Sequence, residues 1–142
     1  PTVARWAVRG VQGGGFDNRD SCTRSNGAFD LAAAEAHATL LAELAHREKL
    51  AAGQKNTPEL GRRGPADIGF DFAVAEECRS FDECTAYTDV YGDYVIDIEY
   101  IDDLGAPLAQ VCADPQLPRS SVIRDRMLSA PGSPDYRLER CR

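Results

Sequence analysis

Short apolar runs that end abruptly in charged residues alternate along the chain with helical patterns. Five such runs begin and end at turn signals or at a change to polar residues, and we expect them to be strands. They cover residues 10–16, 51–56, 68–75, 94–100 and 121–123. Helices are expected at residues 31–50, 82–90 and 107–112. Because strands that alternate with helices pair in parallel, we predict an α/β fold of about five parallel strands. The pattern suits part of a doubly wound sheet or of a (β/α)8 barrel.

The clearest helix covers residues 31–50. Its apolar residues recur at steps of three and four, and two further leucines widen the apolar stripe. Asp30 is a good N-cap, and Gly53 suits the position just after the last turn. The stripe comprises Leu31, Ala34, Ala38, Leu41 and Ala45, widened by Leu40 and Leu44.

Length limits the number of domains, and charge limits the classes of partner that the chain can bind. A chain of 142 residues buries enough surface for one core, so we expect a single domain over residues 1–142. The net charge of −7 argues against a nucleic-acid partner and favours a cationic substrate. No apolar run approaches the roughly 20 residues of a membrane span, so we expect no membrane partner.

Five cysteines bear on the compartment. Cys78 and Cys84 flank a polar loop and are expected to form a disulfide. Cys141 pairs most reasonably with Cys112 and would then hold the tail in place. Cys22 is left over. The alternative is an intracellular protein with five buried thiols. No two cysteines have the close spacing of a zinc site, and we expect no metal or cofactor.

Polar residues follow each expected strand. In a barrel, these strand ends build the active site. Hydrolysis of a glycosidic bond needs two carboxylates, one to protonate the leaving oxygen and one to attack carbon or activate water. Asp17 and Glu76 are the candidate pair. The alternative is that these charges are simply solvated. The strand ends read Asp17-Asn18, Lys55-Asn56, Glu76-Glu77, Glu99-Tyr100 and Asp125-Arg126.

Taken in order, these motifs resemble the endo-alpha-1,4-polygalactosaminidases, glycoside hydrolase family 114. The family's P-D-N-x-D type loop is matched by Phe16-Asp17-Asn18-Arg19-Asp20, and its G-L-K-N type strand by Gly53-Gln54-Lys55-Asn56. Its F-D-F-A-V-N-E-x-C stretch and following E-C are matched by residues 70–78 and by Glu83-Cys84. The I-E-Y ending is matched by Ile98-Glu99-Tyr100, and the closing strand and terminal cysteine by residues 121–126 and Cys141.

The resemblance implies a (β/α)8 barrel, of which this chain would be the C-terminal part without the first three strands. It implies a secreted hydrolase of alpha-1,4-linked galactosamine in a partly deacetylated, cationic polysaccharide, with Asp17 and Glu76 as the catalytic pair. Lys55 is a candidate to hold a carboxylate ionised or bind a sugar hydroxyl, and Glu99 to raise the proton affinity of a neighbouring acid. The full set expected to bind substrate is Asn18, Asp20, Lys55, Asn56, Glu77, Glu99, Tyr100 and Asp125.

Three departures from the family pattern keep alternatives open. Gly15 and Ser21-Cys22 differ from the usual loop, and Ala75 replaces the Asn before the catalytic Glu. A degenerate barrel that binds carbohydrate without cleaving it is one alternative. Another is a structural fragment that associates through unpaired strand edges or with a missing N-terminal half.

Overall fold

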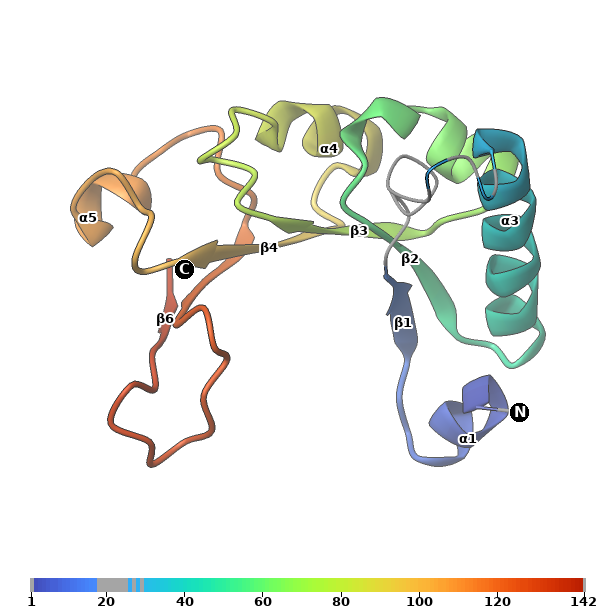
Figure 1. The fold of residues 1–142 in the computed structure, drawn as a ribbon, viewed down its shortest axis with the longest axis horizontal. Coiled ribbons are helices and arrows are strands. Elements are labelled where there is room, and N and C mark those ends of the chain that lie inside the picture. Colours follow the sequence, from blue (N-terminus) through green and yellow to red (C-terminus); the bar gives the residue numbers. More distant parts are fainter. Residues whose placement is uncertain (1, 18–25, 27, 29, 142) are drawn as a thin grey trace. The chain divides into compact units, whose positions relative to one another are not determined.

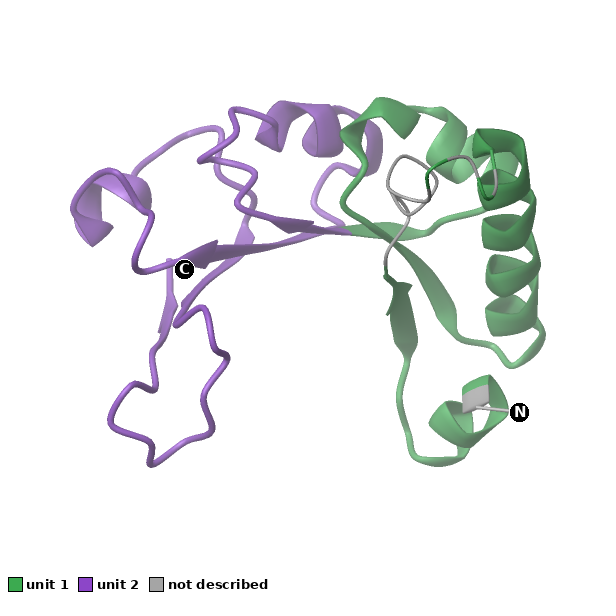
Figure 2. Cartoon of the chain, viewed as in Figure 1, with its two compact units in different colours: residues 1–73 green, residues 74–142 purple. Residues whose placement is uncertain are grey.

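A computed structural model describes residues 2–17, 26, 28 and 30–141 (Figure 1). The chain divides into two compact units, Pro1–Ala73 and Val74–Arg142 (Figure 2). The first unit contains α1 (Thr2–Val8), β1 (Gly13–Phe16), α3 (Leu31–Arg47), β2 (Ala51–Lys55), the 3-10 helix η1 (Pro58–Leu60) and the π-helix η2 (Gly64–Ile68). Strand β3 (Phe72–Glu76) crosses the boundary. The second unit continues with α4 (Cys84–Tyr91), β4 (Val95–Tyr100), α5 (Leu108–Val111), β5 (Ser120–Arg124) and β6 (Leu138–Arg140).

The six strands form one sheet in the order β1-β2-β3-β4-β5-β6. The β1–β2 and β4–β5 pairs are parallel, and β6 is antiparallel to β5. A strand order that follows the sequence is that of a barrel, because a doubly wound sheet reverses its order at a switch point. The topology therefore decides between the two predicted architectures. No helix among the described residues is long and apolar enough to cross a membrane.

Helix α3 packs against β2 and η2 in the first unit through a stripe of alanines. These are Ala34, Ala38, Ala42 and Ala45, all buried. The predicted widening of the stripe is wrong, since Leu40 and Leu44 are 58% and 37% exposed. Small side chains let the helix axis approach the sheet, whereas the larger leucines lie toward solvent.

The two ends of α3 differ in how well the sequence predicted them. At the start, the Asp30 carboxylate accepts a hydrogen bond from the Ala33 N–H at 2.8 Å, as expected of an N-cap. At the other end, the helix stops at Arg47, and Lys49 rather than Gly53 adopts the left-handed conformation. Gly53 lies inside β2, where an added Cβ would come within 2.5 Å of the Phe72 ring. Close packing, not a turn, therefore requires this glycine.

The third strand begins later than predicted. The sequence suggested a strand over residues 68–75, but Gly64–Ile68 forms the π-helix, and Gly69 ends it at a φ of +90°. The strand proper is Phe72–Glu76. The apolar residues Ile68 and Phe70 are buried all the same, so the burial was predicted and the conformation was not.

The second unit has a core cluster made of Leu104, Val111, Leu117 and Ile123. Helix α5 supplies Val111, and Cys141 packs against the same cluster. Strand β6 was not predicted; all three of its residues are exposed, and only its pairing with β5 makes it a strand. Helix α1 was not predicted either.

Candidate active site

The carboxylate of Glu76 lies at the end of β3, beside the end of β4. Glu76 is the last residue of β3, and Tyr100 is the last residue of β4. The Tyr100 hydroxyl donates a hydrogen bond to the Glu76 Oε1 at 2.8 Å. Burial, and then the hydrogen bond to Glu76, raises the pKa of Tyr100 to about 12. The phenol therefore keeps its proton at neutral pH and remains a donor to this carboxylate.

Arg126, two residues after β5, contacts both acidic and aromatic residues at these strand ends. Its Nε and Nη2 atoms donate to Asp102 at 2.9 and 3.0 Å, and Nη2 also donates to Glu77 at 2.9 Å. Its guanidinium lies over the Tyr100 ring, 4.5 Å from the centroid. These hydrogen bonds raise the pKa of Arg126 and lower the pKa of Asp102. We call Glu76, Glu77, Tyr100, Asp102 and Arg126 the strand-end cluster.

The backbone turns sharply just after Glu76. Glu77 has a φ of +58°, in the left-handed region that a residue with a Cβ seldom adopts. Its N–H donates to the Ile98 carbonyl at 2.9 Å, which extends the pairing with β4 by one residue. Positive φ values outside glycine concentrate at functional sites, where surrounding contacts hold them. Here the Arg126 guanidinium supplies such a contact.

Glu99 lies on the opposite face of β4 from Tyr100. Adjacent residues of a strand point to opposite faces, and Glu99 is fully buried. Its carboxylate accepts hydrogen bonds from the Arg79 N–H at 2.8 Å and the Ser80 hydroxyl at 3.4 Å. Burial raises the pKa of Glu99. This carboxylate therefore supports the loop after β3.

Asp125 is held by hydrogen bonds from the backbone of the segment that follows it. Its carboxylate accepts hydrogen bonds from the backbone N–H groups of Ser129 at 2.7 Å and Arg137 at 3.1 Å. The Ser129 N–H is the main reason that the pKa of Asp125 falls to about 2. The side chain thus shapes the segment between β5 and β6. Its neighbour Arg126 reaches the strand-end cluster instead.

The predicted residues of the first unit lie at the ends of β1 and β2. The parallel register pairs Phe16 with Gln54, so the next residues, Asp17 just after β1 and Lys55 at the end of β2, lie at the same level. Asp17 is exposed. The buried Gln54 amide donates to the Asn56 and Thr57 carbonyls, both at 2.9 Å, and so turns the chain after β2. The predicted binding residues Asn18 and Asp20 lie outside the described residues.

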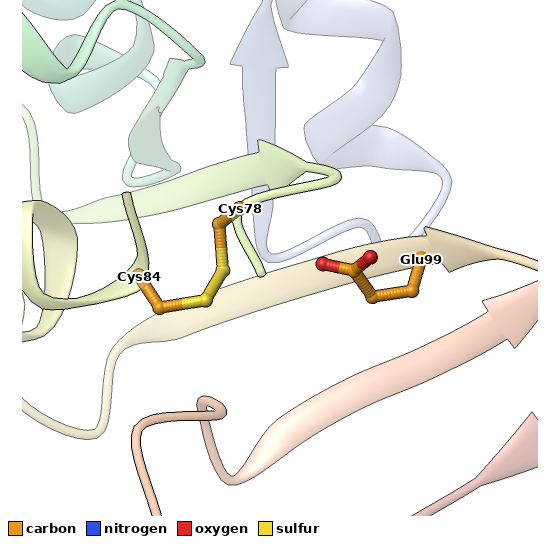
Figure 3. Close-up of side chains that lie close together, drawn as sticks. All are labelled: Cys78, Cys84 and Glu99. Carbon is orange, nitrogen blue, oxygen red and sulfur yellow. A yellow bond between two sulfur atoms is a disulfide. The ribbon is translucent and has the colours of Figure 1, made fainter. Parts of the chain in front are cut away.

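Both predicted disulfides are confirmed, Cys78–Cys84 and Cys112–Cys141. The sulfur atoms of Cys78 and Cys84 and the carboxylate of Glu99 lie within 4.8 Å of one another (Figure 3). This grouping has the residue types of a metal site. The two sulfur atoms are bonded to each other, however, and a thiolate is the form that binds a metal. The grouping is thus a disulfide packed on a buried acid.

Sequence reasoning missed Arg126 and Asp102 as members of the site. The sequence places Arg126 in the polar strand end Asp125-Arg126, but the substrate-binding residue predicted there is Asp125. A usable signal was present: an arginine two residues after a strand is long enough to reach neighbouring strand ends, and its planar fork suits paired carboxylates.

Comparison with known proteins identifies the family. The sequence model of glycoside-hydrolase family GH114 matches residues 2–142. The fold is similar to the crystal structure of Aspergillus fumigatus Ega3 in complex with galactosamine, with a TM-score of 0.76 and 23% sequence identity. That match covers 98% of this chain and 57% of Ega3, so this chain spans little more than half the length of that relative. No curated protein matches the sequence. Since the family match covers nearly every residue, the chain belongs to glycoside-hydrolase family GH114.

Proposed function

We propose that the chain forms the C-terminal part of a (β/α)8 hydrolase that cleaves alpha-1,4-galactosaminidic bonds in a partly deacetylated polysaccharide. Membership of family GH114 supports the reaction class. The observation that carries the proposal is the hydrogen bond from Tyr100 to Glu76 at the strand end, because it holds a carboxylate where barrels place catalytic groups.

The proposed catalytic pair is Asp17 and Glu76. Each follows or ends a strand of the sheet, at the carboxyl end of β1 and of β3. One carboxyl group would protonate the leaving oxygen, and the other would attack the anomeric carbon or activate water. Tyr100 would keep Glu76 in one orientation, which removes the cost of ordering it during the reaction.

The charge of the strand-end cluster suits a cationic polymer. Glu76, Glu77 and Asp102 contribute three carboxylates, and Arg126 contributes one guanidinium, so the cluster is anionic overall. Galactosamine without its acetyl group carries an ammonium at neutral pH. An anionic site attracts such a unit and repels anionic sugars. The chain as a whole has the same sign, with a net charge of −7.

We also propose that the protein is secreted. Two disulfides in a chain of this size are typical of proteins that fold in an oxidising compartment. A polysaccharide outside the cell would be accessible to such an enzyme.

The test replaces each proposed catalytic carboxylate by its amide. Glu76→Gln and Asp17→Asn are expected to reduce the release of reducing ends from partly deacetylated polygalactosamine by at least about a hundredfold, since each removes an essential acid or nucleophile. The assay is run on this chain and on any longer protein that contains it. Glu59→Gln and Asp89→Asn, both at exposed positions, are the charge-matched controls.

Two results would change the conclusion. Near-normal turnover in either amide variant would remove that residue from the catalytic pair. Saturable binding of the polymer with no product from the unmodified protein would favour the alternative of a carbohydrate-binding barrel.

A further inference from the structure

A cavity lies entirely within the second unit, on loops that also carry residues of the strand-end cluster. It has a volume of about 330 Å³, near the lower end of the roughly 300–1,000 Å³ typical of small-molecule sites. Three segments line it: the disulfide-closed loop after β3, the loop after β4 and the segment between α5 and β5. Its polar lining residues are Arg79, Ser80, Asp82, Asp103, Asp114 and Gln116.

The Arg79 side chain connects the three segments that line the cavity. Arg79 donates through Nε to Asp114 at 3.2 Å and through Nη1 to the Leu104 carbonyl at 2.8 Å. The Ser80 hydroxyl lies 3.1 Å from the Asp103 carbonyl, and the buried Glu99 accepts the Arg79 N–H. The Cys78–Cys84 disulfide closes the loop at its base. The cavity is therefore formed before any ligand arrives, which lowers the entropy cost of binding.

Two carboxylates of the lining are available to a ligand. Arg79 is paired with Asp114. Within the described part of the chain, the side chains of Asp82 and Asp103 have neither an ion-pair nor a hydrogen-bond partner, and both residues are exposed. A carboxylate with a free face binds an ammonium through a charge-assisted hydrogen bond.

An exposed aromatic residue stands next to Asp82 in the sequence, outside the lining of the cavity. Phe81 lies between two lining residues, Ser80 and Asp82, and is 64% exposed although it is large and apolar. The short disulfide loop restrains the backbone that carries it. An exposed aromatic face attracts both the C–H face of a sugar ring and a nearby ammonium group. Within the lining itself, the carboxylates of Asp82 and Asp103 suit an ammonium group, and Ser80 and Gln116 suit the hydroxyl groups of an amino sugar.

The cavity and the strand-end cluster share their loops. Glu77 and Asp102 belong to the cluster, and the residues that follow each of them, Cys78 and Asp103, line the cavity. The two loops that carry Glu77 and Asp102 thus also form part of the cavity wall.

We propose that this cavity is an accessory site that binds a cationic amino-sugar unit of the same polymer, beside the site of cleavage. The inference rests on the proposed function for its ligand. Asp82 and Asp103 of the lining are its binding residues, and neither belongs to the strand-end cluster. The site would anchor the polymer and raise its affinity without taking part in bond cleavage.

The experiment titrates the isotope-labelled chain with galactosamine and follows the backbone amide signals by NMR. It is run at about pH 6, where the amine is protonated and aspartates are ionised. We expect saturable shifts at Ser80, Asp82, Asp103 and Gly105, which line the cavity. The double variant Asp82→Asn/Asp103→Asn should raise the dissociation constant for these shifts at least about tenfold. The matched control is Asp89→Asn/Asp135→Asn, which removes the same charge at exposed positions outside the lining.

Neutral and sugar-free ligands separate the contributions to binding. N-acetylgalactosamine should bind more weakly because it lacks the ammonium, and ethanolamine should bind more weakly because it lacks the ring. Equal affinity for ethanolamine would overturn the assignment to a sugar. Equal affinity in the double variant and its control, or shifts confined to the strand-end cluster, would overturn the site itself.

Hydrolysis assays distinguish failure of this inference from failure of the proposed function. If the polymer is cleaved, the double variant should raise KM for the polymer and leave kcat unchanged. An unchanged KM together with cleavage would contradict the accessory site alone. Galactosamine shifts in the cavity without any cleavage would support the site and contradict the proposed hydrolase.

Discussion

Removing the Tyr100 hydroxyl tests its hydrogen bond to Glu76. Tyr100→Phe keeps the ring under the Arg126 guanidinium but leaves the Glu76 Oε1 without this donor. We expect kcat to fall by about 10- to 100-fold, the cost of one hydrogen bond to a charged group, with little change in melting temperature. Reducing-end release and thermal denaturation measure the two effects. Tyr94→Phe, at a residue 73% exposed, is the control. Unchanged turnover in Tyr100→Phe would mean that Glu76 does not need this support.

A second residue, Asp97, carries a cost in stability. It is fully buried on the same face of β4 as Glu99, and neither of its carboxylate oxygens has a well-formed hydrogen bond among the described residues. The Ser121 hydroxyl donates its hydrogen bond to the Pro118 carbonyl, at 2.7 Å. Burial, and then the Glu99 charge, raises the pKa of Asp97 to about 7. The folded protein therefore holds a proton that the unfolded chain releases near pH 3.8.

This proton makes stability depend on pH. Because the folded-state pKa is the higher one, stability is greatest below the unfolded pKa and falls as pH rises toward about 7. Asp97→Asn has no carboxyl proton to lose, so its melting temperature should fall less between pH 5 and 8 and exceed that of the parent by about 5 °C at pH 8. The pKa of Glu99 is raised as well, so the variant should keep the part of the pH dependence of stability that Glu99 causes. Thermal denaturation across pH tests this, with Asp89→Asn as the exposed control. Identical curves for parent and Asp97→Asn would refute the assignment.

Among the elements, β6 depends most on covalent support. It has three residues, all exposed, and pairs only with β5 in the described structure. The residue that follows it, Cys141, is bonded to Cys112 beside α5, 29 positions away in sequence. By lowering the entropy of the unfolded chain, a bridge of that span stabilises the folded state by roughly 3.5 kcal/mol. The six-residue separation of Cys78 and Cys84 gives roughly 2 kcal/mol.

Loss of this bridge should release β6 before the rest of the unit. In Cys112→Ser/Cys141→Ser we expect amide hydrogen exchange to rise first over residues 138–140, with a lower melting temperature. Cys78→Ser/Cys84→Ser should instead raise exchange over residues 78–83 and leave β6 protected. Hydrogen exchange read by mass spectrometry separates the two patterns. Unaltered protection of β6 in the first variant would show that its pairing with β5 is sufficient.

At the scale of the whole molecule, the net charge of −7 sets how a cationic polymer approaches. Attraction between opposite charges is screened over about 10 Å at 0.1 M salt and about 3 Å at 1 M. The affinity for partly deacetylated polymer should therefore fall about tenfold or more between low salt and about 0.5 M salt. Fully acetylated polymer, which is neutral, should show little salt dependence. Binding isotherms at several salt concentrations test this, and equal salt dependence for both polymers would exclude charge as the source of affinity.

Local sequence signals were enough for the features that depend on neighbours along the chain. The alternation of apolar runs and helical patterns predicted α3 and the strands β1 to β5, although β3 begins later than expected. Asp30 predicted the helix start, and the close spacing of Cys78 and Cys84 predicted their disulfide. These features are set by hydrogen-bonding period, capping chemistry and loop length, which act over a few residues. The motif order likewise indicated the family.

Tertiary structure decided which polar residue at each strand end does what. Glu99 and Tyr100 are adjacent, yet the pleat sends one into the buried layer and the other to Glu76. Asp125 and Arg126 are adjacent too, but backbone N–H groups from Ser129 and Arg137 hold the first while the second reaches Asp102 and Glu77. Such partners are far apart in sequence, so register and loop path select them. The same holds for β6, whose exposed residues become a strand only because β5 offers an edge to pair with.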